Sequence, residues 1–335
     1  MNRRVALADF HAAMEEANVV PLWEIEDATN RPPEPPHIWR WETLAPLLET
    51  AIEATSMTDA ERRVLVLNNP ALLATGRSRG SGLTLGFNLQ VLMPGETARP
   101  HRHSMNALRF VMEGTGATTI VDGKPCPMEP GDMILTPGWT WHEHVHEGDG
   151  RMIWLDVLDV PFHHYLDTGE FEPGPAYDLP ELPPDEAFAA PGFVPVSGAA
   201  DMAYSPLFRY PWETARDALA ALPPAADGSR RMLYTNPLTG GPTMATMECS
   251  LLSLAEGRRT RPYRSNSNSA FIVVAGEGRS EIGETTIEWR RHDIVSLPHG
   301  YWIGHAAEAD GAWLFEVSDR EMLKRLHMLR DEFAD

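Results

Sequence analysis

The feature of this sequence that most limits its fold is a pattern of residues that occurs twice, about 162 positions apart. Between Gly95 and His144, glycines, prolines, aromatic residues and histidines stand at fixed spacings. The matching positions in the second copy are Gly257, Arg261-Pro262-Tyr263, Gly276-Glu277-Gly278, Asp293, Pro298, Trp302 and His305. Self-similarity at a long, fixed offset predicts an internal duplication, so we expect two copies of one domain.

Each copy is predicted to consist of short strands. From Leu83 to Val91, apolar residues alternate with polar or small ones that include Asn88 and Gln90, which is the period of a strand with one buried face. Further strands are expected at 108–112, 117–121, 133–136 and 152–158, separated by Gly, Pro and Asp turns. Short strands at this spacing favour a β-sandwich or barrel over βαβ units.

The remaining segments differ in character. Residues 1–65 have helical spacing, with a capped helix start expected at Thr58, whereas 161–230 are rich in proline and contain one expected helix near 212–222. Apolar residues in 320–333 indicate an amphipathic helix. We therefore predict five parts: a helical N-terminal arm (1–80) that packs on a barrel or a neighbouring subunit, a first barrel (81–165), a Pro-rich connection (166–230), a second barrel (231–319) and a C-terminal helix (320–335).

Composition narrows the possible partners. A formal net charge of -20 argues against nucleic acid or an anionic membrane surface, because both require a cationic face. No stretch is apolar for the roughly 18 residues that a membrane helix needs, and no signal peptide is evident, so a cytoplasmic location is the default expectation. Cys126 and Cys249 are expected to be buried small hydrophobes without a disulfide.

Three histidines in the first copy carry the expected chemistry. His101 and His103 are two residues apart, so on a strand their imidazoles point to the same face, and His142 follows Pro137 on a later strand. Three neutral imidazoles suit Fe, Zn, Cu or Ni and leave the full charge of a divalent ion for an anionic substrate. The alternative is a polar barrel mouth without metal. The second copy has Tyr263, Ser265 and Ile303 at these positions, so no metal is expected there.

This pattern resembles the cupin superfamily, whose motifs are G(x)5HxH(x)3-4E(x)6G and G(x)5PxG(x)2H(x)3N. The first motif matches from Gly95 to Gly116, and the second matches Gly131, Pro137 and His142. Arg109 stands where the motif has a glutamate ligand, and an arginine cannot bind a cation because it stays protonated. The resemblance implies an all-β bicupin core, with two double-stranded β-helix (jelly-roll) barrels, an N-terminal helical arm and a C-terminal helix.

A narrower resemblance covers most of the chain. The segments ERRVLVLNNPAL, PHRHSMNALRFVMEG, PGDMILTPGWTWHEH, MIWLDVLDVP and RTRPYRSNSNSAFIVVAGEGRS are similar to the gentisate 1,2-dioxygenase family, which includes salicylate and 1-hydroxy-2-naphthoate dioxygenases. The resemblance implies Fe(II) held by His101, His103 and His142. It also implies an aromatic substrate that chelates the iron through a carboxylate and an ortho-hydroxyl. Dioxygen then cleaves the ring between those two carbons, and both oxygen atoms enter the product.

The resemblance also implies roles for other residues. Arg109 is predicted to point to the same strand face as His103 and is expected to donate two hydrogen bonds to the substrate carboxylate. Gln90 is expected to contact the substrate. His144 is expected to accept the hydroxyl proton or orient dioxygen, and Asp156 to support this histidine or the ring substituent. The alternatives are a buried ion pair for Arg109, an ordinary strand position for Gln90 and a turn position for Asp156. Two further expectations are that Arg77 and Arg79 flank the entrance and that His146, His163 and His164 lie at the surface.

Several choices stay open at this level. Gentisate is the expected substrate, with salicylate, a 5-substituted salicylate or 1-hydroxy-2-naphthoate as alternatives, because Asn88 and Val157 depart from the family pattern near the expected pocket wall. A non-oxidative isomerase, a sugar-binding module or a storage protein is the alternative from a different class, and metal content would discriminate it. The family resemblance also implies a homodimer or homotetramer.

Overall fold

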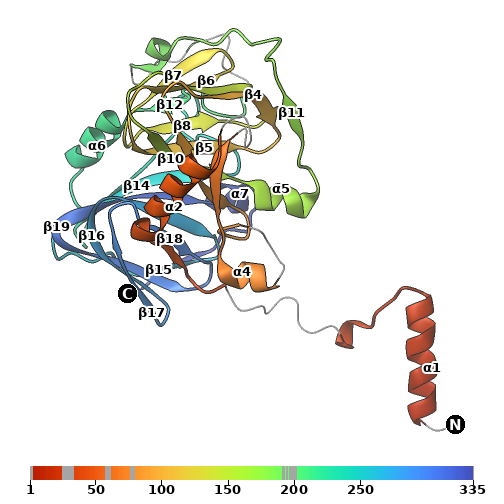
Figure 1. Ribbon diagram of the computed structural model, residues 1–335. Helices are drawn as coiled ribbons and strands as arrows, with labels where there is room; N and C mark the ends of the chain where they lie inside the picture. The colour runs from red at the N-terminus through yellow and green to blue at the C-terminus, as the bar shows by residue number, and fades with distance from the viewer. Residues whose placement is uncertain are drawn as a thin grey trace. The chain divides into compact units, whose positions relative to one another are not determined.

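The computed structural model describes residues 3–24, 34–56, 62–75, 80–190, 193, 195 and 202–334. The chain divides into two units, Met1–Pro33 and Glu34–Asp335. The first unit contains helix α1 (Arg3–Glu16) and the 3-10 turn η1 (Leu22–Glu24), and a 2.8 Å hydrogen bond joins His11 to Glu24 within it. The second unit contains both barrels; in Figure 1 the strands of the first barrel run mainly from orange to green, and those of the second mainly from cyan to blue.

The first barrel is built from two antiparallel sheets. Their strand orders are β12-β8-β5-β10-β3-β2 and β11-β4-β9-β6-β7. The strands are β2 (Arg63–Leu67), β3 (Gly86–Leu92), β4 (Thr97–His103), β5 (Ala107–Glu113), β6 (Ala117–Val121), β7 (Lys124–Met128), β8 (Met133–Thr136), β9 (His142–His146), β10 (Met152–Leu158), β11 (Phe171–Pro173) and β12 (Arg209–Tyr210). The strands predicted from alternation and turn residues are all confirmed.

The second barrel is one nine-stranded sheet. Its longest strands, β16 and β19, pair with each other through two β-bulges, so that one continuous sheet curves around the barrel. The strands are β1 (Ile38–Trp39), β13 (Ser229–Leu233), β14 (Glu248–Leu254), β15 (Tyr263–Ser265), β16 (Ser269–Ile282), β17 (Thr285–Arg290), β18 (Ile294–Leu297), β19 (Trp302–Ser318) and β20 (Asp331–Phe333). The predicted bicupin fold is confirmed.

Each barrel also receives a strand from the segment that leads into the other barrel. β1 pairs with β18 of the second barrel, and helix α2 (Trp41–Ala54) then leads to β2 of the first barrel. In the same way, β12 pairs with β8 of the first barrel, and helix α6 (Trp212–Ala221) leads to β13 of the second. The repeated unit therefore begins well before the histidine motif.

Matching carboxylates fix the starts of these two helices. Asp293 accepts the backbone N–H of Trp41 at 2.8 Å, and Asp132 accepts that of Trp212 at 2.8 Å. The helices expected at 41–55 and 212–222 are confirmed, but the prediction that 1–65 is helical is wrong at β1 and β2, because both strands pair with partners remote in sequence. The expected helix start at Thr58 lies outside the described residues.

The end of the chain also differs from the prediction. Helix α7 (Arg320–Arg325) ends early, and Asp331–Phe333 forms strand β20, so a single helix over 320–333 is wrong. The Arg320 guanidinium binds both carboxylate oxygens of Asp331, at 2.7 and 2.6 Å, which holds β20 against β15. The first barrel has the same arrangement, because helix α5 (Val160–Leu166) is followed by β11, which pairs with β4.

Reciprocal hydrogen bonds join the two barrels. Asp159 accepts from Thr246 of the other barrel at 2.6 Å, and Asp319 accepts from Thr84 at 2.6 Å. Phe110 and Phe315 stack between the barrels with ring centroids 4.4 Å apart. One apolar core therefore extends through both barrels, and it fixes the position of the first barrel's site relative to the second barrel.

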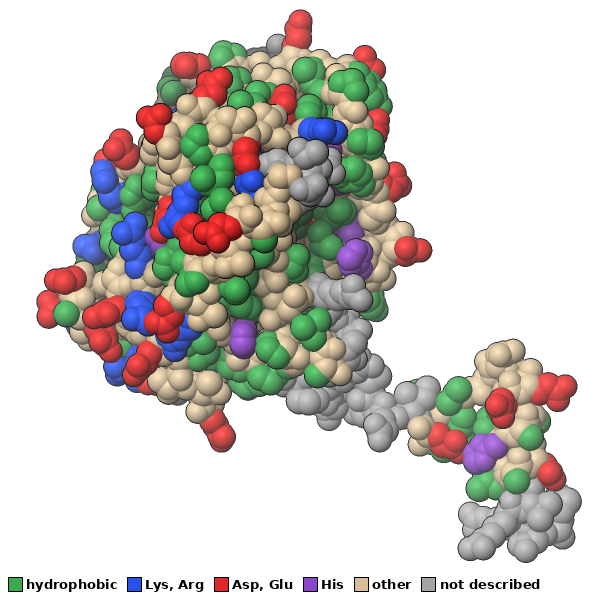
Figure 2. All heavy atoms as spheres, in the orientation of Figure 1, with side chains coloured by type: hydrophobic (Ala, Val, Ile, Leu, Met, Phe, Trp, Pro, Cys, Tyr) green, Lys and Arg blue, Asp and Glu red, His purple; other side chains and the backbone are tan. Residues whose placement is uncertain are grey.

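The remaining elements lie at the periphery of the barrels. Helix α4 (Pro70–Thr75) follows β2, and the 3-10 turn η2 (Asp185–Phe188) lies in the proline-rich connection. Cys126 and Cys249 are buried and unpaired, as expected. On the face drawn in Figure 2, basic side chains lie among acidic ones, and none of the described helices is long and apolar enough to cross a membrane.

Candidate active site

Two neighbouring strands of the first barrel bring the three predicted histidines together. His101 on β4 lies directly opposite His142 on β9, and His103 follows on the same face of β4. One ring nitrogen of each histidine lies within 4.8 Å of the others. All three side chains are buried. Among the described residues, this is the group of His, Cys, Asp and Glu side chains that is arranged to hold a metal ion.

Backbone carbonyls orient all three imidazoles. The Nδ1 atoms of His101, His103 and His142 lie 3.1, 2.9 and 3.0 Å from the carbonyl oxygens of Arg99, Met105 and Thr140, respectively. A carbonyl can only accept, so each Nδ1 carries the proton and each Nε2 keeps its lone pair. Nε2 of His142 is buried without a hydrogen-bond partner among the described residues. A shared cation would satisfy these lone pairs.

The electrostatic environment keeps these imidazoles neutral. Burial lowers the pKa of His101 to about 3 and that of His103 to about 4, with further lowering by the positive charges of Arg62 and Arg109. Burial also holds the pKa of His142 well below its usual value. A neutral imidazole is the form that binds a metal, so the donor set is ready near neutral pH without losing protons.

The ligand strand is held in place from its outer side. β11 pairs with β4, with Phe171 opposite His103 and Pro173 opposite His101. The Phe171 ring also stacks on the His101 ring, with centroids 5.4 Å apart and an interplanar angle of 25°. From sequence, this segment is predicted to belong to the connection between barrels, and its contact with His101 was not predicted. The only available signal was its position after the first barrel's short helix.

His144 lies on the same face of β9, two residues beyond His142. Its Nδ1 lies 2.9 Å from the Thr119 hydroxyl oxygen, and that hydroxyl donates its proton to Met128 Sδ at 3.2 Å. In the arrangement in which this single proton stays on the sulfur, the hydroxyl oxygen accepts Nδ1–H of His144. Nε2 of His144 is then an unprotonated, buried nitrogen with no partner among the described residues. Burial and the charge of Arg109 keep the pKa of His144 well below its usual value.

A row of polar residues crosses the neighbouring sheet. Asp156 on β10 lies opposite Arg109 on β5 and opposite Asn88 on β3, so the three side chains share one face. Nε of Arg109 is 3.3 Å from Oδ1 of Asp156, and the arginine also donates to Thr136 at 2.8 Å. Arg109 is therefore a buried ion-pair partner. This ion pair is compatible with a substrate contact, because the contacts with Asp156 and Thr136 involve Nε and Nη1 of Arg109 and do not involve Nη2.

Asp156 does not support His144 directly, contrary to one expectation. It accepts a hydrogen bond from Trp154 Nε1 at 3.0 Å, and the Trp154 ring packs on His144 at 5.3 Å between centroids. The hydroxyl of Thr119 gives His144 its direct support. Burial raises the pKa of Asp156 to about 6, against the opposing effect of Arg109.

The other predicted residues fall on two faces. Gln90 is buried on β3, and its amide Nε2 has no hydrogen-bond partner among the described residues. Asn88 shares the face of Asp156. Val157 belongs to the apolar core and lies on the opposite face of β10 from Asp156, so the expectation that it shapes the pocket wall is wrong.

Comparison with known proteins places the chain in a family. It is 37% identical to gentisate 1,2 dioxygenase 1 of Aquipseudomonas alcaligenes, over 96% of this chain and 95% of the relative. The chain belongs to the gentisate 1,2-dioxygenase family. It is also 33% identical to 5-aminosalicylate 1,2-dioxygenase of Comamonas sp, over 96% of this chain and 89% of that one. A cupin domain model matches residues 88–158.

A solved structure extends the family match to three dimensions. Salicylate 1,2-dioxygenase from Pseudoaminobacter salicylatoxidans, described as an adduct with gentisate, superposes with a TM-score of 0.91 at 32% identity. The match covers 99% of this chain and 95% of the other. The gentisate 1,2-dioxygenase family fold is therefore shared over both barrels.

Some neighbours of the gentisate dioxygenase site were not singled out from sequence. Arg62, just before β2, contributes positive charge to His101 and His103 and lies over the Phe171 ring at 5.9 Å. It belongs to the quoted segment ERRVLVLNNPAL, so that segment was the available signal. His146 is fully buried, so its expected surface position is wrong. It lies two residues beyond His144 and therefore on the same face of β9. Arg77 and Arg79 lie outside the described residues.

Proposed function

We propose that this protein is a ring-cleaving Fe(II) dioxygenase that acts on an aromatic carboxylate with an ortho-hydroxyl group, with gentisate as the preferred substrate. The observation that carries the proposal is the donor set. His101, His103 and His142 present three buried, neutral Nε2 atoms to one point, and no carboxylate of the described residues joins them. Such a site leaves a divalent ion with its full charge for a dianionic substrate.

Iron fits this site by the chemistry of its donors. Imidazole nitrogen is a ligand that ferrous iron accepts, and the Nδ1–H contacts to backbone carbonyls orient each ligand for one metal. When bound, Fe(II) would supply the one-electron chemistry that allows dioxygen to react with a closed-shell aromatic ring. The protein's own residues have the tasks of binding, orientation and proton transfer.

Charge and hydrogen bonding favour a carboxylate substrate. Arg109 and Arg62 both act on the histidines through their positive charge, which would attract an anion into the site. Gln90 Nε2 is a buried donor without a partner among the described residues, and a substrate carboxylate or hydroxyl would satisfy it. A ring with neither group would leave this donor unpaired.

His144 is suited to accept the substrate's hydroxyl proton. Its Nε2 carries a lone pair because Nδ1–H is committed to Thr119, and it lies on the strand face of His142. Removal of this proton would give a phenolate, which is the electron-rich form that ring cleavage needs. Trp154, whose Nε1–H is accepted by Asp156, would pack against the ring of His144.

The choice of gentisate rests on the relatives. Several of them are named for gentisate, and one is named for 5-aminosalicylate. Asn88, on the face of Asp156, is the residue that we expect to contact the substituent opposite the hydroxyl. A 5-substituted salicylate is therefore the second candidate substrate.

The test is anaerobic loading with Fe(II), followed by oxygen uptake and product spectra. Gentisate, salicylate, 5-aminosalicylate, 1-hydroxy-2-naphthoate and catechol form the panel, because catechol has the hydroxyl but lacks the carboxylate. We expect turnover of the hydroxy acids and none of catechol. Cleavage of catechol at a matching rate would overturn the argument from the carboxylate. Success with 5-aminosalicylate and failure with gentisate would change only the preferred substrate.

We also propose a homo-oligomer, either a dimer or a tetramer. Leu22 and Trp23 in the N-terminal unit are 79% and 77% exposed, and large exposed apolar side chains mark interaction surfaces. Multi-angle light scattering of the full chain should give a mass of at least two chains. A single-chain mass at working concentration would contradict this.

A further inference from the structure

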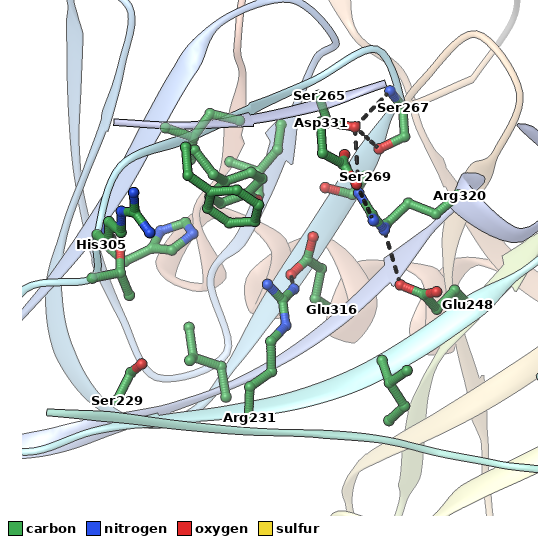
Figure 3. Close-up of a pocket in the computed structure, with 18 of the residues that line it drawn as sticks. Ser229, Arg231, Glu248, Ser265, Ser267, Ser269, His305, Glu316, Arg320 and Asp331 are labelled. Carbon is green, nitrogen blue, oxygen red and sulfur yellow. Dashed lines mark hydrogen bonds and ion pairs between the residues drawn. The ribbon is translucent and has the colours of Figure 1, made fainter. Parts of the chain in front are cut away.

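The second barrel contains a cavity of about 530 Å³ that the proposed dioxygenase reaction does not use. We propose that this cavity binds an uncharged ring compound that carries hydroxyl groups, without a metal. Figure 3 shows the His305 ring and the Arg231 and Glu316 side chains facing the same space. The volume lies within the range of about 300–1,000 Å³ that is typical of small-molecule sites.

Half of the first barrel's polar arrangement recurs around this cavity. His305 Nδ1 is 2.8 Å from the Ser280 hydroxyl, as His144 Nδ1 is 2.9 Å from that of Thr119. Glu316 lies opposite positions on β14 and β16, as Asp156 lies opposite positions on β3 and β5. The imidazole and the carboxylate have therefore kept their places in the duplicated barrel.

The other half, the metal ligands, is replaced by groups that suit an organic ligand. Tyr263 and Ile303 stand opposite each other on β15 and β19, as His101 and His142 do in the first barrel. Tyr263 lines the cavity, and burial raises the pKa of its hydroxyl above the usual value. Ile303 and Leu297 add apolar wall. A ring can pack against this wall while its hydroxyl groups reach Tyr263 and His305 Nε2.

The charges around the cavity favour an uncharged ligand. Arg231 is paired with Glu316, and Arg320 binds both Asp331 and Glu248. Each of these two guanidinium groups already has a carboxylate partner, and the third lining arginine, Arg261, donates from Nε to the carbonyl oxygen of Ala334. With Asp227, the acidic side chains of the lining outnumber the arginines. At Arg231 and Arg320 an anionic ligand would have to displace a carboxylate, whereas a neutral hydroxyl can join the existing hydrogen bonds.

The structure also indicates why the cavity stays open. β20 forms one wall, with Phe333 opposite Tyr263 and Asp331 opposite Ser265. Arg320 clamps Asp331 at 2.6 and 2.7 Å, so this wall is fixed at its polar end. A rigid, preformed cavity loses little free energy to ordering when it binds a ligand.

The experiment is isothermal titration of the iron-loaded full chain with hydroquinone and with D-glucose. These probes share the neutral hydroxylated ring but differ in whether the ring is aromatic. We expect at least one of them to bind with one site per chain, and the probe that binds identifies the source of the ligand. Binding of neither probe would overturn the proposal.

Three variants of the second barrel and one control variant of the first locate the binding. Ile303→Trp fills the cavity and should abolish binding, and Tyr263→Phe should weaken it by about 5-fold, which corresponds to the loss of one hydrogen bond. His305→Gln should weaken binding, whereas the matched change His144→Gln in the first barrel should not. Binding that survives Ile303→Trp in a protein with native circular dichroism would overturn the assignment. If that variant does not fold, equal effects of His305→Gln and His144→Gln would do so.

Discussion

Replacing Thr119 with valine tests whether a single hydroxyl sets the protonation of His144, the histidine that we propose to be catalytic. Thr119 is fully buried, and its hydroxyl oxygen lies 2.9 Å from Nδ1 of His144, whose N–H we propose that it accepts. Valine has the same shape but no acceptor, so Nδ1–H would be buried without a partner. The proton would then favour Nε2, which is the nitrogen proposed to accept the substrate's proton.

The size of the effect follows from the lost hydrogen bond. Leaving a buried donor unsatisfied costs about 1–3 kcal/mol. Because about 1.4 kcal/mol corresponds to a factor of ten, the population of the competent tautomer should fall by roughly 5- to 150-fold. We therefore expect the kcat for gentisate to fall by about 10- to 100-fold, with no loss of iron, since the Thr119 hydroxyl bonds to Met128 and His144 and the proposed ligands are oriented by backbone carbonyls.

The assay measures kcat, KM and iron content for three variants. Thr119→Ser keeps the hydroxyl and should retain most of the activity. Ser280→Ala removes the equivalent hydroxyl beside His305 in the second barrel and should leave kcat unchanged. The reasoning is refuted if Thr119→Val retains full activity, loses iron, or behaves like Ser280→Ala.

Three further predictions concern the same barrel. His142→Ala should lose iron, whereas His144→Ala should keep it and turn over roughly 100-fold more slowly, as metal analysis and kinetics would reveal. Arg109→Met should lower the free energy of unfolding by about 3–5 kcal/mol in urea titrations, because it leaves the buried carboxylate of Asp156 unpaired. The iron-free protein should lose stability as pH falls from about 6.5 towards 4. The unfolded chain binds protons on its histidines in this window, whereas burial keeps groups such as His101, with a pKa of about 3, neutral in the fold. A denaturation midpoint that does not change over this window would contradict the last prediction.

The C-terminal segment illustrates why some elements were not predictable. Met322, Leu323 and Leu326 have helical spacing, and a helix does form at Arg320–Arg325. The next residues pair instead with β15, a strand more than sixty positions earlier, and Arg320 fixes Asp331 there. Local periodicity contains no information about such a remote partner. The same reason explains the missed strands β1 and β2.

The sequence by itself determined the two barrels and the predicted metal ligands. The offset between the two copies indicated the duplication, and the spacing of His101 and His103 placed both rings on one strand face, because strand geometry depends only on local alternation. Only the tertiary structure decided what surrounds them. Phe171 stacks on His101, and Thr119 orients His144, because strand pairing brings together residues that are far apart in the chain. The tertiary structure also decided that the imidazole of His305 and the carboxylate of Glu316 line an open cavity in the second barrel, because the register of the sheet sets which side chains point into the same interior.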